Sequence, residues 1–209
     1  MDADSSAFLN AGTTVHIGQT IDQHSDVTIV AQGDVTLDEK IDQHATADIT
    51  SINGSISIWQ KVDQWAIAAL KAGSNVKIGQ TIDQHSDVTV VAQGDVTINE
   101  KIDQDATADI TSTGGSVSIG QKIDEHATAR ITAQNDILIG QKLDQNTNST
   151  ITSINGSITV TQGISGGATA TLSAVNGTIT MDTIDGGCTL NWSAQNLNCP
   201  HQNGTVNHI

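Results

Sequence analysis

The stretch IDQHSDVTIVAQGDVTL occupies residues 21–37, and it returns at residues 82–98 as IDQHSDVTVVAQGDVTI. Its opening tetrapeptide, Ile-Asp-Gln-His, also stands at 41–44, and variants of it follow further along the chain. Counted from the first residue of the tetrapeptide, the spacings are 20, 21, 20, 20, 21 and 20 residues. The first residues of these motifs, called anchors below, are Ile21, Ile41, Val62, Ile82, Ile102, Ile123 and Leu143. A fixed period of this size is the sequence signature of a repeat architecture.

Within each repeat the apolar residues alternate, which is the period of a β-strand and not of a helix. In the first repeat Val15 and Ile17 share a face, and so do Val27 and Ile29, while pairs such as Gly33-Asp34 are typical of turns. Short strands that recur in this way can wind into stacked coils. The sequence therefore predicts an all-β fold, a single-stranded β-solenoid (parallel β-helix) of about nine coils of 20–21 residues with a cap at each end.

The repeat also divides the chain. Residues 11–193 form the predicted solenoid, in three super-repeats of 61 residues at 11–71, 72–132 and 133–193. Residues 1–10 are expected to form an N-terminal cap, with Phe8 and Leu9 as its plug, and residues 194–209 a C-terminal cap that leaves the repeat. Caps are expected because an open solenoid end exposes unpaired backbone and apolar side chains.

Columns of Ile and Val are expected to fill a narrow interior, which explains how a chain of 209 residues can fold with four aromatic side chains. Strict alternation would also turn two sets of glutamine and glutamate inward, for example Gln60 and Gln64. Buried amides are costly unless they are hydrogen-bonded. Two solutions are open: the stacked amides bond to one another, or a bend near the anchor points them outward.

The composition excludes some partners. With 8 basic against 23 acidic side chains the formal charge is −15, and no basic stripe exists for nucleic acid. No apolar run approaches the ~20 residues that span a bilayer. The first ten residues lack the basic and apolar regions of a signal peptide.

Two polar columns follow the anchors. The residue after each anchor is aspartate, and this column is expected to face outward; it comprises Asp22, Asp42, Asp63, Asp83, Asp103, Asp124 and Asp144. Stacked carboxylates repel one another, so they need lysines such as Lys40, turn hydrogen bonds or a linear Ca²⁺ site. In the second column, His24 and His44 beside Asp22 and Asp42 could ligate a transition metal, the alternative being solvated turn histidines.

The third coil departs from the surface pattern of the others. Trp59, Trp65 and Ile67 occupy positions that hold small or polar residues in the first coil. Three exposed apolar residues on one coil predict a contact patch for self-association or for stacking against a carbohydrate. The alternative is that the N-terminal segment folds back and covers them.

Two cysteines, Cys188 and Cys199, lie near the end of the chain. A disulfide between them would close a short loop and stabilise the cap by roughly 2–3 kcal/mol. Two free buried thiols are the alternative.

Nothing in the sequence favours catalysis. Neither a Ser-His-Asp or Cys-His arrangement nor a glycine-rich phosphate motif is evident, and Arg130 is the single arginine. The enzymes on parallel β-helices that cleave acidic polysaccharides build their clefts from long loops, whereas no coil here exceeds 21 residues. The left-handed hexapeptide acyltransferases use shorter coils. The chain is therefore expected not to be an enzyme.

The phrases Gly-Asp-Val-Thr (33–36, 94–97) and Ile-Asn-Gly-Ser-Ile (52–56, 154–158) resemble those of bacterial β-solenoid surface proteins, in particular filamentous-haemagglutinin-type adhesin repeats. The resemblance covers residues 11–193 and implies secretion to an extracellular or cell-surface location, with adhesive or scaffold roles. The cytoplasmic bactofilins, which are β-helical polymers, are a second likeness.

The sequence thus favours a non-catalytic solenoid that acts as a rigid scaffold, an adhesin stalk or a self-assembling subunit in a homo-oligomer or filament. An alternative is binding to ice or another ordered surface through threonine columns, for example Thr107, Thr128 and Thr169. A second alternative is a solenoid that binds Ca²⁺ or another metal through the Asp and His ladders.

Overall fold

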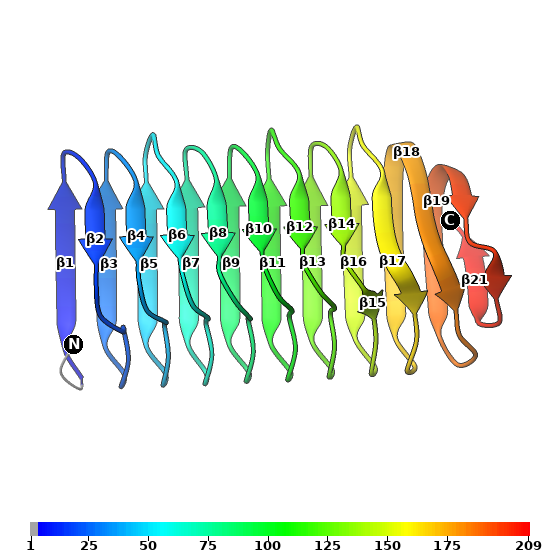
Figure 1. The fold of residues 1–209 in the computed structure, drawn as a ribbon, viewed down its shortest axis with the longest axis horizontal. Coiled ribbons are helices and arrows are strands. Elements are labelled where there is room, and N and C mark those ends of the chain that lie inside the picture. The colour runs from blue at the N-terminus through cyan, green and yellow to red at the C-terminus, as the bar shows by residue number, and fades with distance from the viewer. Residues whose placement is uncertain (1–3) are drawn as a thin grey trace.

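The backbone forms one continuous sheet that winds into stacked coils. The structure, a computed structural model, describes residues 4–209, which contain 21 strands and no helix. Each strand pairs in parallel with a strand of a neighbouring coil, and about ten turns stack into a rod with the two chain ends at opposite ends (Figure 1). The predicted β-solenoid is confirmed.

Each regular coil contains a long strand, a short strand and a single bridging residue. Long strands form one face of the rod and short strands the other (Figure 1). The long strands are β1 (Ser6–Ala11), β3 (Asp26–Ala31), β5 (Thr46–Ser51), β7 (Ile67–Ala72), β9 (Asp87–Ala92), β11 (Thr107–Ser112), β13 (Thr128–Ala133) and β16 (Asn148–Ser153). The short strands are β2 (Val15–Ile17), β4 (Val35–Leu37), β6 (Ile56–Ile58), β8 (Val76–Ile78), β10 (Val96–Ile98), β12 (Val117–Ile119) and β14 (Ile137–Ile139). The anchors form isolated parallel bridges from Ile21 through to Leu143.

The last coils have longer strands. These are β15 (Lys142–Leu143), β17 (Ile158–Ile164), β18 (Thr169–Ile184), β19 (Thr189–Asn198), β20 (His201–Gln202) and β21 (Thr205–His208). Their pairing contains register shifts between Val160 and Gly163 and between Ala174 and Thr178. These irregularities absorb the drift of the sequence pattern, because Ile179 and Met181 are still buried.

The core consists of the predicted ladders. Ile98, for example, pairs in register with Ile78 on one side and Ile119 on the other, and all three are fully buried. Small residues such as Ala66 and Ala106 narrow the interior where the long strands begin. Burying one such isoleucine contributes roughly 1.5–3 kcal/mol, and the ladder repeats this contribution in every coil.

The ends of the rod differ from the predicted caps. β1 begins inside the predicted N-terminal cap and pairs with β3 in register, so the first coil already begins at Ser6. Phe8 is 70% exposed and is therefore no plug, whereas Leu9 packs partly against the core. At the other end β21 pairs with β19, so the tail extends the solenoid by a further partial coil and does not leave it.

Aromatic rings close the C-terminal end instead. Trp192 continues an inward column on β19, opposite Leu172, and its ring lies 4.4 Å from the ring of His208 at an angle of 52°. In the part of the chain that the structure describes, no helix long and apolar enough to cross a membrane is found.

Candidate functional site

The turn that follows each aspartate has an unusual backbone. In seven coils both of its residues have positive φ, for example 52° and 60° at Gln23 and His24 and 50° and 65° at Gln64 and Trp65. The remaining pairs are Gln43-His44, Gln84-His85, Gln104-Asp105, Glu125-His126 and Gln145-Asn146. Left-handed conformations are unfavourable for residues with a Cβ, and glutamine is not among the residues that adopt them readily. The turn is therefore strained by its side chains.

The chain itself shows that other residues can form this turn. The eighth coil places Gly166 and Gly167 there, with φ of 61° and 80°, and the backbone N–H of Asn146 donates to the carbonyl of Gly166 as in the other coils. Glycine adopts this conformation without a steric penalty. Because the fold accepts Gly-Gly, the side chains in the first seven coils are present at a conformational cost, and strain of this kind is a feature of functional sites.

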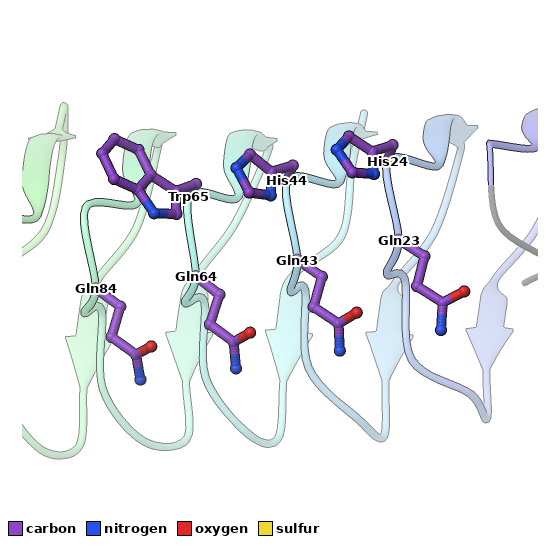
Figure 2. Close-up of a pocket in the computed structure, with 7 residues that line it drawn as sticks. All are labelled: Gln23, His24, Gln43, His44, Gln64, Trp65 and Gln84. Carbon is purple, nitrogen blue, oxygen red and sulfur yellow. The ribbon is translucent and has the colours of Figure 1, made fainter.

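The second residues of the first four turns form a row of rings along the rod, and Figure 2 shows the first three of them. The ring centroids of His24 and His44 are 4.9 Å apart, those of His44 and Trp65 6.2 Å, and those of Trp65 and His85 4.2 Å. Neighbouring rings are parallel to within 13°. In the next coil the row ends at Asp105, whose carboxylate lies 3.6 Å from Nε2 of His85.

The first residue of each turn forms a parallel row of amides. The side chains of Gln23, Gln43, Gln64 and Gln84 extend in the same direction from successive turns (Figure 2). Together with His24, His44 and Trp65 they line a groove, which we call the turn groove. The bend at the anchor thus points these glutamines outward, which is one of the two solutions left open by the sequence. In the other polar set, Gln60 Nε2 donates to a carboxylate oxygen of Glu39 in the preceding coil.

The aspartate column is buried, so its predicted outward orientation is wrong. Asp42, Asp63, Asp103 and Asp124 have no exposed side-chain surface, and Asp83 and Asp144 are nearly as buried. The physical reason is the turn: the anchor and the aspartate after it are both buried at a corner of the coil, so inward–outward alternation stops there.

Lysines compensate five of the buried carboxylates. In each of these coils the lysine two residues before the aspartate places its ammonium on Oδ2 of that aspartate; the pairs are Lys40–Asp42, Lys61–Asp63, Lys101–Asp103, Lys122–Asp124 and Lys142–Asp144. The predicted Lys–Asp pairing is therefore present, but inside the corner and not on an open face. A buried charge needs such a partner.

Carboxyl groups in neighbouring coils also change each other's pKa. Burial, a hydrogen bond with Asp42 and the charge of Asp42 raise the pKa of Asp63 to about 6 against the opposing effect of Lys61. Burial acts to raise the pKa of Asp42 as well, but hydrogen bonds with Asp63 and Lys40 outweigh it and the pKa is lowered. Burial raises the pKa of Asp103, although Lys101 opposes the shift.

Asp83 has a different partner. Thr81 stands where the neighbouring coils have lysine, and its hydroxyl donates to Oδ2 of Asp83 at 2.9 Å. The buried Oδ1 of Asp83 has no hydrogen-bond partner. This coil therefore interrupts the lysine ladder.

The predicted metal ligands are only partly brought together. His24 and His44 are stacked and exposed, but Asp42 is buried and paired with Lys40, and Asp22 is half-buried. Across residues 4–209 there is no group of three or more His, Cys, Asp or Glu side chains that could hold a metal ion. The geometry gives the transition-metal and Ca²⁺ hypotheses no specific support.

The three members of the predicted apolar patch lie on different parts of the coil. Trp59 follows β6 and is 53% exposed, with the ammonium of Lys77 5.2 Å from its ring centroid. Trp65 belongs to the ring row, and Ile67 opens β7 on the long-strand face. Residues 4–11 do not cover them, because β1 pairs with β3 in the first coils; residues 1–3 lie outside the described part.

The cysteines are free thiols in the structure, so the disulfide considered for Cys188 and Cys199 is not formed. Both are buried, and the thiol of Cys199 faces backbone carbonyls, 3.6 Å from that of His201 and 3.9 Å from that of Asp182. Burial raises the pKa of the Cys199 thiol.

Sequence reasoning missed the strain of the turns. A signal was present, because the later copies of the motif read Ile164-Ser-Gly-Gly and Ile184-Asp-Gly-Gly and so place glycine where the earlier copies have Gln-His. No family model, curated protein or solved structure matches the chain. The structure defines its class as a β-solenoid repeat protein.

Proposed function

We propose that this chain is a non-catalytic structural β-solenoid, a rigid scaffold or adhesin-type stalk at the cell surface or outside the cell. The supporting observation is the continuous parallel strand pairing from β1 to β21, which leaves each regular coil bonded to both neighbours along its strands and at its anchor. A rod built in this way resists bending because every coil shares a sheet with the next. The connections between strands are short turns, and no long loop projects from the rod that residues 4–209 form (Figure 1).

Electron microscopy of the purified protein tests this function. Ten coils at a strand spacing of ~4.8 Å predict a rod about 50 Å long. Particles of uniform length and straight outline are the expected result, and filaments would identify the self-assembling form of the scaffold. Flexible or globular particles would contradict the proposal.

A second candidate is binding to an ordered surface such as ice, and one observation favours it. On β16, β18 and β19 the outward residues of the long-strand face are uncharged and mostly hydroxylated; they are Asn148, Thr150, Thr152, Thr169, Thr171, Ser173, Thr189, Asn191 and Ser193. Charged residues interrupt the same columns earlier, at Asp87, Asp109 and Arg130. Thermal hysteresis measured on the purified chain distinguishes the two functions, since a scaffold has none.

A further inference from the structure

The turns that line the turn groove have a strained backbone, which they share with the turns at residues 104–105, 125–126 and 145–146. Its members Gln23, His24, Gln64 and Trp65 all have positive φ. The chain uses Gly166-Gly167 for the same turn, so the backbone path does not require them. The groove is therefore best explained by what its side chains contact outside the chain.

The charge of the groove indicates the kind of ligand. The chain carries a formal charge of −15, yet none of the seven residues that line the groove is Asp, Glu, Lys or Arg. The turns become acidic only further along, at Asp105 and Glu125. A neutral groove on an acidic rod matches a neutral ligand, because a cation would be drawn to the carboxylates and an anion repelled by the whole molecule.

The chemistry of the groove indicates hydroxyl groups. Each glutamine amide offers two N–H donors and an acceptor oxygen, and so can bond to a hydroxyl in either direction. The indole ring of Trp65, which is 53% exposed, adds apolar surface beside them at the part of the ring that the stacked rings of His44 and His85 leave open. Amides next to an aromatic ring suit a sugar, which has hydroxyls at its edge and C–H groups on its faces.

The spacing of the groove indicates a polymer. The amides of Gln23, Gln43, Gln64 and Gln84 recur once per coil along the axis, at the strand spacing of ~4.8 Å (Figure 2). An extended chain of pyranose rings has a repeat close to this spacing. Such a chain lying along the rod would meet an equivalent amide at every sugar unit.

We propose that the turn groove binds a neutral linear polysaccharide, which runs parallel to the rod axis over the first four coils. The glutamine amides bond to its hydroxyls, and the Trp65 ring is the apolar contact that fixes its position. This site does not depend on the rod being a scaffold, and a rod without it would still have the proposed structural function.

Titration of the full chain with neutral hexasaccharides tests the site. Cellohexaose, xylohexaose, mannohexaose and N-acetylchitohexaose are added separately while tryptophan fluorescence and heat are recorded. We expect at least one hexasaccharide to bind with one-to-one stoichiometry, and its disaccharide to bind at least about tenfold more weakly, because it reaches fewer amides. A chain to which no hexasaccharide binds at millimolar concentration, or to which only acidic oligogalacturonate binds, would overturn the proposal.

Variants taken from the chain's own repeats locate the site. Gln64→Gly with Trp65→Gly introduces the pair found at Gly166-Gly167, so it should keep the fold, checked by circular dichroism, and weaken binding at least about tenfold. Trp65→His, which places at this turn the residue of four other coils, should also weaken binding. The matched control is Gln145→Gly with Asn146→Gly, the same change outside the groove, which should bind like the original chain. Undiminished binding by both Trp65 variants would refute the site.

Discussion

The ammonium of Lys61 pairs with the carboxylate of Asp63, whose side chain is completely buried at the corner of the third coil. Burial alone would lower the pKa of Lys61, but its hydrogen bond to Asp63 and the neighbouring carboxylates raise it. The lysine side chain is 27% exposed, so this pair is largely removed from solvent. Loss of Lys61 would leave an isolated carboxylate in the interior, and the pair stabilises the fold because it prevents this.

Removal of that lysine should be costly. We expect Lys61→Met to lower the free energy of unfolding by about 3 kcal/mol at pH 7.5, because one partner of a buried pair is lost. Urea unfolding followed by circular dichroism measures this, and the double variant with Asp63→Asn should recover most of the loss. An unchanged unfolding midpoint in Lys61→Met would show that the pair does not stabilise the fold.

The pKa of Asp63 predicts a pH dependence. Its folded value of about 6 is raised above the ordinary value of 3.8, so its contribution is fully present below pH 3.8 and is lost as the pH rises through 6. The loss amounts to at most about 3 kcal/mol. As the pH rises from 4 to 7, we expect the difference in stability between Asp63→Asn and the original chain to shift in favour of the variant, because the variant has no carboxyl group to ionise. Parallel pH profiles of the two proteins would disprove this assignment.

Asp83 and Asp103 make a matched pair. Asp83 lacks a lysine on its own coil, so Asp83→Asn should stabilise the protein by about 1 kcal/mol, because it removes a buried carboxylate that forms no ion pair with a lysine of residues 4–209 while Thr81 keeps an acceptor. Asp103→Asn should destabilise it, because Lys101 then loses its partner. Thermal melts should show a higher melting temperature for Asp83→Asn and a lower one for Asp103→Asn. Equal changes in melting temperature would contradict the stabilising role of the lysines.

The ladder of isoleucines can be tested at Ile98. We expect Ile98→Asp to lower the free energy of unfolding by at least about 3 kcal/mol, because it places a charge between Ile78 and Ile119 without a partner. The control is Thr97→Asp, which faces solvent next to Lys77 and should have little effect. Equal melting temperatures for the two variants would mean that the inward face has been misassigned.

Self-association is expected to depend on the two exposed tryptophans. Trp59→Ser with Trp65→Ser leaves the core unchanged and should convert oligomers to monomers in analytical ultracentrifugation, since large aromatic side chains dominate many interfaces. Because Trp59 and Trp65 lie on different segments of the coil, each single variant should have its own effect. An original chain that is monomeric at high concentration would contradict this expectation.

The strands could be predicted from the sequence because alternation holds wherever the backbone is extended. It predicted the buried columns that contain Ile29 and Ile98, and the register that stacks them. The same rule failed for Asp42, because a turn with two left-handed residues follows directly and places consecutive residues in the interior. It also failed at the tail, where Thr205–His208 pairs with β19 although its sequence no longer resembles the repeat. The turn groove depends on the same backbone geometry, so its residues could be predicted to form a column, but their common orientation could not.

The first two 61-residue blocks, 11–71 and 72–132, are similar in sequence, and this has a consequence for how the molecule can change its length. Each block spans three coils, about 14 Å of rod at the strand spacing, and ends in the register in which the next begins. A gene that duplicated one block would join coils that already fit each other, and the Trp192–His208 contact at the far end would be undisturbed. Recombination can therefore lengthen or shorten the rod in steps of three coils, and the contacts between coils stay the same.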